Sequence, residues 1–126
     1  MTDIKKQIRP KISSIIKIEH FSMEEKFQNE VLRPIIKLQH DLLLSYFEHY
    51  YLKRNKVKIS ELNSTQKKEI IQKVFKVDTQ LKIELRGLII GLFTVEEYKE
   101  YLGYSSKLNR RINNMIQQRI DSCYVT

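Results

Sequence analysis

The sequence predicts an all-α protein, a single-domain helical bundle of about five or six helices. Only three Gly and two Pro interrupt its 126 residues, which suits helices with short connections better than a turn-rich β-sandwich. Several segments repeat apolar residues every three or four positions, as amphipathic helices do. No stretch alternates with period two for long enough to predict a sheet, and the best strand candidate, KVKIS (56–60), is too short to stand alone.

We read residues 1–21 as an irregular or partly helical arm, closed by HFS (20–22), and residues 22–126 as the helical bundle domain. Ser22 followed by Glu25 forms a capping box, so the first helix of the bundle is expected to start at about residue 23.

Pro34 stands inside a long hydrophobic segment and predicts a joint between two helices. Proline lacks the backbone N–H that a helix interior needs, but it suits the first turn of a new helix. The sequence therefore predicts a short helix over 23–32 and a long one over 34–54. A single kinked helix is the alternative.

Cap residues and amphipathic periods predict two further helices after residue 60. Ser64 or Thr65 caps the first, which covers QKKEIIQKVFK (66–76). Asp78 caps the second, and Gly91 is expected to end it in the left-handed conformation.

The last part of the chain predicts two more helices. Thr94 opens one through a second capping box, and Gly103 closes it. Ser105 or Ser106 caps the final helix, which runs to about Ser122. Its apolar positions recur at spacings of three and four, so they predict one buried stripe: Leu108, Ile112, Met115, Ile116, Ile120 and Cys123, the last read as a small buried hydrophobe.

The formal charge of +8 and the pI of about 9.6 indicate attraction to nucleic acid or another polyanion. Compositional drift is the alternative, since Lys outnumbers Arg, Ala is absent and the charge is spread without a long basic run. Cys123 is the only cysteine, which excludes a disulfide within the chain and favours a reducing compartment.

The longest apolar run, GLIIGLF (87–93), is far too short to span a bilayer, and the N-terminus lacks the pattern of a signal peptide. We therefore expect a cytoplasmic protein without membrane partners. No metal-ligand spacing, phosphate-binding Gly loop or catalytic motif is present, so no cofactor or metal is expected and the sequence leans against an enzyme.

The predicted helix over 34–54 carries polar residues on its apolar side. Apolar side chains cover about two thirds of its circumference, and Gln39 and His40 lie inside that arc. Asn29 and Arg33 join them if helical geometry continues through the joint. A buried Arg must be paired, so this polar cluster predicts a small anion- or carboxylate-binding site in which the Arg33 guanidinium is the bidentate donor. Alternatively, these groups hold the broken backbone at the joint or pair with acids across a subunit interface.

Residues 93–119 resemble a helix-turn-helix, with a capped helix, a glycine turn and a second helix. In this interpretation the DNA-facing residues are Lys107, Asn109, Arg110 and Asn113, with Arg111 on a backbone phosphate. Lys99 departs from the pattern, because it stands where that motif usually has a small residue, and the turn is one residue short. An ordinary αα-hairpin is the alternative.

The run FQNEVLRPIIKLQHDLLL (27–44) resembles a family of small, uncharacterised, all-helical bacterial proteins, and the likeness continues to LNRRINNMI (108–116). Some members of that family carry an automatic glyoxalase label. Metal-dependent glyoxalases are built from repeated βαβββ units with His and Glu ligands, and neither pattern occurs in this sequence, so the label is not carried over. The matching motif positions are Phe27, Gln28, Asn29, Leu32, Arg33, Pro34, Lys37, Gln39 and Asp41.

These observations predict a non-enzymatic protein that self-associates, or binds a protein partner, through its apolar helix faces at 35–51 and 108–123. DNA binding through the last two helices is the first alternative. A small anion- or carboxylate-binding site at Arg33 is the second.

Overall fold

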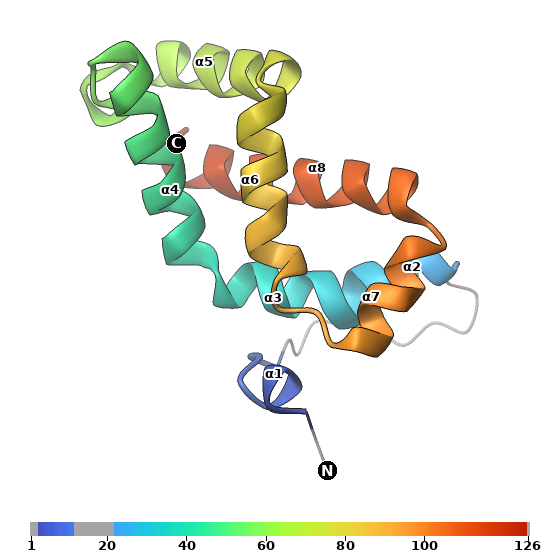
Figure 1. The fold of residues 1–126 in the computed structure, drawn as a ribbon. Helices are drawn as coiled ribbons and strands as arrows, with labels where there is room; N and C mark the ends of the chain where they lie inside the picture. Colours follow the sequence, from blue (N-terminus) through green and yellow to red (C-terminus); the bar gives the residue numbers. More distant parts are fainter. Residues whose placement is uncertain (1–2, 12–21, 126) are drawn as a thin grey trace.

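The computed structural model describes residues 3–11 and 22–125, which form helices joined by short turns, with no strand among them (Figure 1). The all-α prediction is confirmed. The described residues contain seven α-helices of five residues or more, where five or six were expected. In chain order the helices are α1 (Ile4–Gln7), α2 (Met23–Phe27), the π-helical turn η1 (Gln28–Leu32), α3 (Arg33–Leu38), α4 (His40–Asn55), the 3₁₀ turn η2 (Ile59–Glu61), α5 (Ser64–Val77), α6 (Thr79–Ile90), α7 (Val95–Leu102) and α8 (Ser105–Tyr124).

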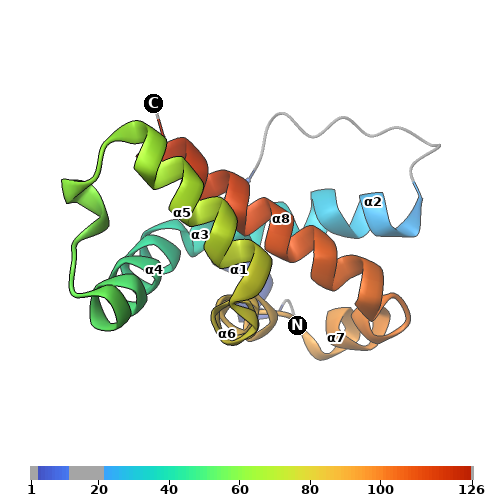
Figure 2. The same ribbon diagram turned by 90° about the horizontal axis from the view of Figure 1, so that it is seen from above.

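Helix α8 is the centre of the bundle. The apolar stripe expected on it is fully buried at Leu108, Ile112, Ile116 and Ile120, each 0% exposed. This stripe packs mainly against α5 and α6. Helix α5 lies along α8 in the opposite direction, and the antiparallel pair α4 and α6 crosses it (Figures 1 and 2). The chain therefore covers this apolar face with its own helices.

The predicted joint at Pro34 is a change of helix type and not of direction. Helices α2, η1 and α3 form one continuous rod (Figure 2). In η1 the Arg33 N–H bonds to the Gln28 carbonyl, five residues back, and this wider turn separates the proline ring from the carbonyl that an α-helix would place against it. Pro34 stands in the first turn of α3, as expected, and is buried.

The chain turns instead at Gln39, where the backbone (φ −89°, ψ 8°) leaves helical geometry. The single long helix predicted over 34–54 is therefore wrong, because it is divided into α3 and α4. In the segment 56–60 the structure has the short turn η2 and no strand.

Most of the predicted caps are present. The Asp78 carboxylate accepts from the Leu81 N–H at 3.1 Å, and Thr94 forms its capping box with Glu97. Helix α5 is capped by Asn63 through a box with Gln66, so the predicted cap at Ser64 or Thr65 is wrong. The cap predicted at Ser105 or Ser106 is also wrong, because the N-cap of α8 is Tyr104, which makes no side-chain capping bond.

Glycine does not end α6 in the predicted way. Gly91 has right-handed geometry (φ −60°), so the expectation of a left-handed cap there is wrong. Among the described residues, positive φ occurs at Lys56, which ends α4 with φ 55°.

The described part of the N-terminal arm docks on the connection between α6 and α7. Lys5 Nζ donates to the Phe93 carbonyl at 3.1 Å. Arg9 donates to both carboxylate oxygens of Glu97 and to the Leu92 carbonyl, each at 2.7 Å. Residues 3–11 thus pack against the bundle, while the rest of the arm predicted over 1–21 lies outside the described residues.

Candidate functional site

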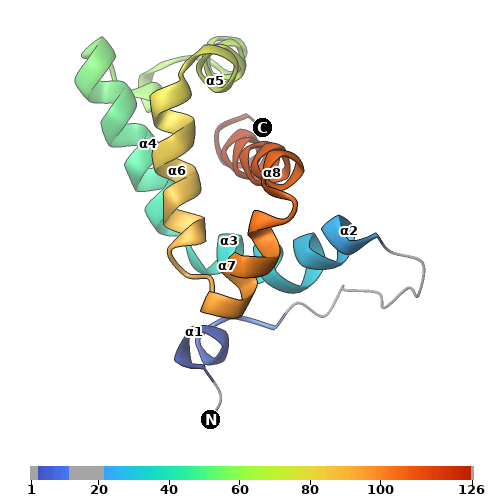
Figure 3. The ribbon, with the colours of Figure 1, turned by 45° about the vertical axis from the view of Figure 1, so that its right-hand side comes forward.

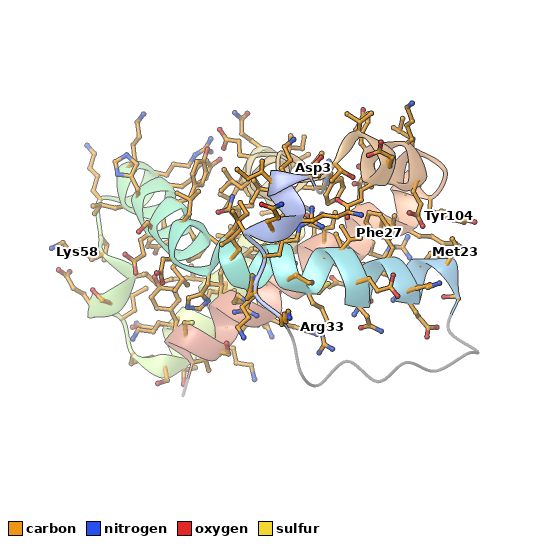
Figure 4. The ribbon with its side chains drawn as sticks, turned by 90° about the horizontal axis from the view of Figure 1, so that it is seen from below. Asp3, Met23, Phe27, Arg33, Lys58 and Tyr104 are labelled. Carbon is orange, nitrogen blue, oxygen red and sulfur yellow. The ribbon has the colours of Figure 1, made fainter. Side chains whose placement is uncertain are left out.

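The predicted cluster of Asn29, Arg33, Gln39 and His40 does not assemble into one site. Gln39 Nε2 donates to the Leu88 carbonyl of α6 at 3.0 Å, and His40 Nδ1 accepts from Arg119 of α8 at 3.2 Å. Arg33 is exposed and points away from the core, on the side of the rod opposite Phe27 (Figure 4). The turn at Gln39 ends the common helix face on which that prediction depended.

The predicted DNA-facing residues also fall on two sides of α8. Arg110 and Arg111 lie within about 60° of Lys107 around the helix, whereas Asn109 and Asn113 lie about 160° and 120° away. Asn109 accepts a hydrogen bond from the Tyr101 hydroxyl of α7. The Asn113 Oδ1 is buried, with no hydrogen-bond partner among the described residues. Only the three basic residues share a surface.

The hairpin of α7 and α8 does not present α8 as a protruding helix. Figure 3 shows α8 nearly end-on, set between α5, α6 and the rod that begins with α2. A recognition helix must reach into the major groove of DNA, and here the neighbouring helices flank α8. This geometry favours the ordinary αα-hairpin over a helix-turn-helix.

The basic residues predicted to face DNA, Lys107, Arg110 and Arg111, line a groove between α8 and the α2–η1–α3 rod. One compartment, of about 680 Å³, contains Lys107, Arg110 and Arg111, with Glu24 on the opposite wall. A second, of about 530 Å³, contains Arg33 and Lys37 on one wall and Arg119 on the other. Gln28, Met115 and Gln118 line both compartments, so the two are continuous. We call this surface the basic groove.

Six cationic side chains line the basic groove against one carboxylate, Glu24. Glu24 lies 3.5 Å from Lys107, and its pKa is lowered, first by a backbone hydrogen bond and then by Ser22 and Lys107. Arg33, Lys37 and Arg110 form no ion pair with another described residue and are exposed. The groove therefore keeps uncompensated positive charge on both walls.

The other two arginines are positioned by neutral partners. Arg111 donates to the Gln28 side chain across the groove, and Arg119 donates to His40. Neither bond neutralises a charge, so both guanidinium groups keep donors for an incoming anion.

Sequence reasoning identified Arg33, Lys107, Arg110 and Arg111 but placed them in two separate sites. It did not assign to either site the remaining residues of the basic groove: Ser22, Glu24, Gln28, Ile36, Lys37, Asn114, Met115, Gln118, Arg119 and Ser122. The 3–4 spacing of Lys107, Arg110, Asn114 and Gln118 marks them as one face of α8. The opposite wall follows only from the tertiary packing of α8 against η1.

Cys123 is exposed, so its interpretation as a buried hydrophobe is wrong. Its Sγ lies 3.8 Å from His40 Nε2. Within residues 3–11 and 22–125, no group of three or more His, Cys, Asp or Glu could hold a metal ion. Nor does this part of the chain contain a helix long and apolar enough to cross a bilayer.

Comparison with protein families, with characterised proteins and with solved structures finds no match for this chain. The resemblance to small all-helical bacterial proteins therefore stays a prediction. Its motif positions Gln28, Arg33 and Lys37 line the basic groove, whereas Leu32 and Pro34 are buried.

Proposed function

We propose that this protein binds nucleic acid through the phosphate backbone, in the basic groove. The observation that supports it is the set of six cations from two elements, α3 and α8, opposed by a single carboxylate. Lysine and arginine side chains that neutralise phosphates release condensed counterions, which supplies most of the affinity of sequence-independent binding. Arg adds paired N–H donors that match phosphate oxygens.

The groove favours backbone contacts over base reading. Its described lining contains amides and Met115 between the cations, and no aromatic side chain. Binding should therefore depend steeply on salt and little on sequence. If all six cations contact phosphates, affinity falls by a few hundred- to about a thousand-fold between 50 and 200 mM salt.

The test is fluorescence anisotropy with a labelled mixed-sequence oligonucleotide at those two salt concentrations. The groove variant combines Arg33→Gln, Lys37→Gln and Arg110→Gln, three exposed cations without ion pairs to described residues. The matched control combines Lys53→Gln, Lys73→Gln and Lys76→Gln, exposed residues of α4 and α5 that remove the same charge elsewhere.

The proposal expects the groove variant to lose at least tenfold in affinity at low salt and the control to lose much less. Equal losses would assign binding to the overall charge of +8. No binding by the unmodified protein at low salt would overturn the proposal. Inorganic phosphate as a competitor tests the narrower idea of a small anion site at Arg33, since displacement at low millimolar phosphate would favour it.

Self-association or binding of a protein partner is a second candidate. The α8 stripe is buried within the chain, so it is not free for a partner. Helix α7 offers a smaller apolar stripe instead, because Val95, Tyr98 and Leu102 are 65%, 44% and 53% exposed and their spacing places them on one face. Light scattering across concentrations tests it: a dimer that Leu102→Glu abolishes supports it, and a monomer throughout contradicts self-association.

A further inference from the structure

We infer that the basic groove takes a single nucleic-acid strand, laid lengthwise with its phosphates between the two walls and its bases turned outward. This inference rests on the proposed function and specifies the ligand of that same groove. It depends on three features, namely the position of the cations, the length of the groove and the chemistry of its floor.

The cations stand on both walls of a furrow between packed helices. Arg33 and Lys37 come from α3, and Arg110 and Arg119 from α8. The two walls are in contact, since Arg111 bonds to Gln28 across the floor. The axes of packed helices lie about 8–10 Å apart and side chains fill the space between them, so we expect a duplex to touch only the rims and one phosphodiester chain to lie along the furrow above the contact.

The position of α8 also argues against a duplex. A helix that reads a duplex projects into its major groove. Helix α8 lies between α5 and the α2–η1–α3 rod (Figure 3), and its cations line one wall of the basic groove. A single strand that lies in this groove can contact cations on both of its walls.

The length of the groove sets the size of the bound segment. Lys107 and Arg119 are the outermost cations of the groove on α8 and are twelve residues apart, which corresponds to about 18 Å of helix. At 3.4 Å per nucleotide of a stacked strand, this length holds about five nucleotides. That number falls within the site sizes of about 4–16 nucleotides seen for single-strand binding folds.

The floor provides no platform for bases. Between the two cationic ends lie Gln28, Asn114, Met115 and Gln118. Most single-strand binders stack bases on aromatic rings, and each stacked base contributes about 1–3 kcal/mol. The described lining offers no ring, so the phosphates carry the affinity and the bases stay in solvent. Binding should therefore tolerate the removal of bases.

Three labelled probes of twelve nucleotides test this inference by fluorescence anisotropy at 50 mM salt: a mixed-sequence single strand, its duplex, and a single strand of abasic sites. A diffuse positive surface prefers the duplex, which has the higher charge density. We expect the opposite, with the single strand binding at least fivefold more tightly than the duplex. The abasic strand should bind within about threefold of the intact strand.

Two variants tie the preference to the groove. The triple variant Arg33→Gln, Lys37→Gln and Arg110→Gln should bind the single strand at least tenfold more weakly. Asn114→Glu places a negative charge on the exposed floor of the groove without removing a cation. It should lower the affinity for the single strand by a similar factor. Thermal melts establish that both variants fold, and the Lys53, Lys73 and Lys76 variant is the control.

The outcomes separate the two proposals. Equal or tighter binding of the duplex, lost in both groove variants, would overturn the single-strand inference and keep the proposed function. If the abasic strand bound tenfold more weakly than the intact strand, bases would have to contact the groove, and the inference that they point outward would be overturned. No binding of any probe at 50 mM salt would overturn the proposed function itself.

Discussion

The buried ion pair of Arg9 and Glu97 should be the most sensitive polar contact in the molecule. The two side chains are 7% and 9% exposed, and Arg9 binds the carboxylate through two bonds of 2.7 Å. Glu97→Gln leaves the guanidinium buried against a neutral amide. Breaking a buried pair from one side costs about 3–5 kcal/mol, a large share of the roughly 5–15 kcal/mol that stabilises a domain.

Glu97 has a second role, which limits the loss. Its Oε1 accepts from the Thr94 N–H at 2.8 Å as part of the capping box of α7, and a Gln side chain keeps that acceptor. The double variant Arg9→Met with Glu97→Gln removes both charges. It should therefore lose less stability than the sum of the two single variants, because each single variant leaves one buried charge unpaired and the double variant leaves none.

The same pair predicts a pH dependence. Burial raises the pKa of the Glu97 carboxyl, but hydrogen bonds from Arg9 and Thr94 and the charge of Arg9 together outweigh it, so the pKa lies below its ordinary 4.5. A carboxyl with a lowered pKa in the folded state stabilises the protein above about pH 4.5. That contribution is lost as the pH falls through the folded pKa. The difference in free energy of unfolding between the unmodified protein and Glu97→Gln should therefore become smaller as the pH falls through that range.

Urea unfolding followed by circular dichroism at pH 7, and at steps from pH 5 to pH 3, measures these effects. Glu96→Gln is the matched control, since this neighbouring carboxylate is exposed and its loss should change stability by less than about 0.5 kcal/mol. A cost below about 1 kcal/mol for Glu97→Gln at pH 7 would refute the reasoning. A difference in unfolding free energy that stays constant down to pH 3 would also refute it.

Three further changes test local features. Lys56→Gly should raise the free energy of unfolding by about 0.5–1 kcal/mol, because Lys56 has a positive φ of 55°. Lys53→Gly, inside α4, should lower it by about 1 kcal/mol. Urea unfolding measures both changes. Asn63→Ala should cost about 1 kcal/mol through the lost cap of α5, and Ser64→Ala much less. Cys123 is exposed, so a chromogenic thiol reagent should modify it in the native protein within about tenfold of the rate in urea.

The sequence predicted those features whose physical cause is local. A capping box is made within four residues, so Thr94 with Glu97 could be identified without knowledge of the fold, and α7 begins where that box predicts. The same holds for the cap at Asp78. The stripe on α8 follows from helical period alone, and four of its six positions are fully buried. Met115 and Cys123 lie at its margin, where burial depends on the neighbouring helices.

The features that the sequence did not predict depend on distant partners. The buried arginine was expected at Arg33 and is found at Arg9, and both precede a proline. The partner of Arg9, Glu97, lies 88 residues further along the chain, and no local pattern connects them. The basic groove arises in the same way, since Arg33 and Arg119 meet only when α8 packs against the rod.

Gln39 makes a tertiary hydrogen bond at the turn between α3 and α4. In a regular α-helix the Leu88 carbonyl accepts from the N–H of Leu92, but that N–H bonds to Ile89 at 3.1 Å and leaves the carbonyl without its helical donor. Gln39 Nε2 replaces it at 3.0 Å. We therefore expect Gln39 to hold the backbone at this turn, the role that the structural alternative gave to the polar cluster, although the turn lies at Gln39 and not at Pro34.

Replacing Gln39 should therefore cost more than replacing an ordinary helical glutamine. Gln39→Ala leaves the half-buried Leu88 carbonyl unpaired and should lower the free energy of unfolding by about 1–2 kcal/mol. Gln39→Glu should cost at least as much, because it opposes a carboxylate to a carbonyl oxygen. Gln72→Ala, at an exposed position of α5, is the control and should stay within about 0.5 kcal/mol. Equal effects at Gln39 and Gln72 in urea unfolding would mean that water satisfies the Leu88 carbonyl. The packing of Ile36 and Leu43 on either side of the turn, both about 1% exposed, would then have to set the direction of α4.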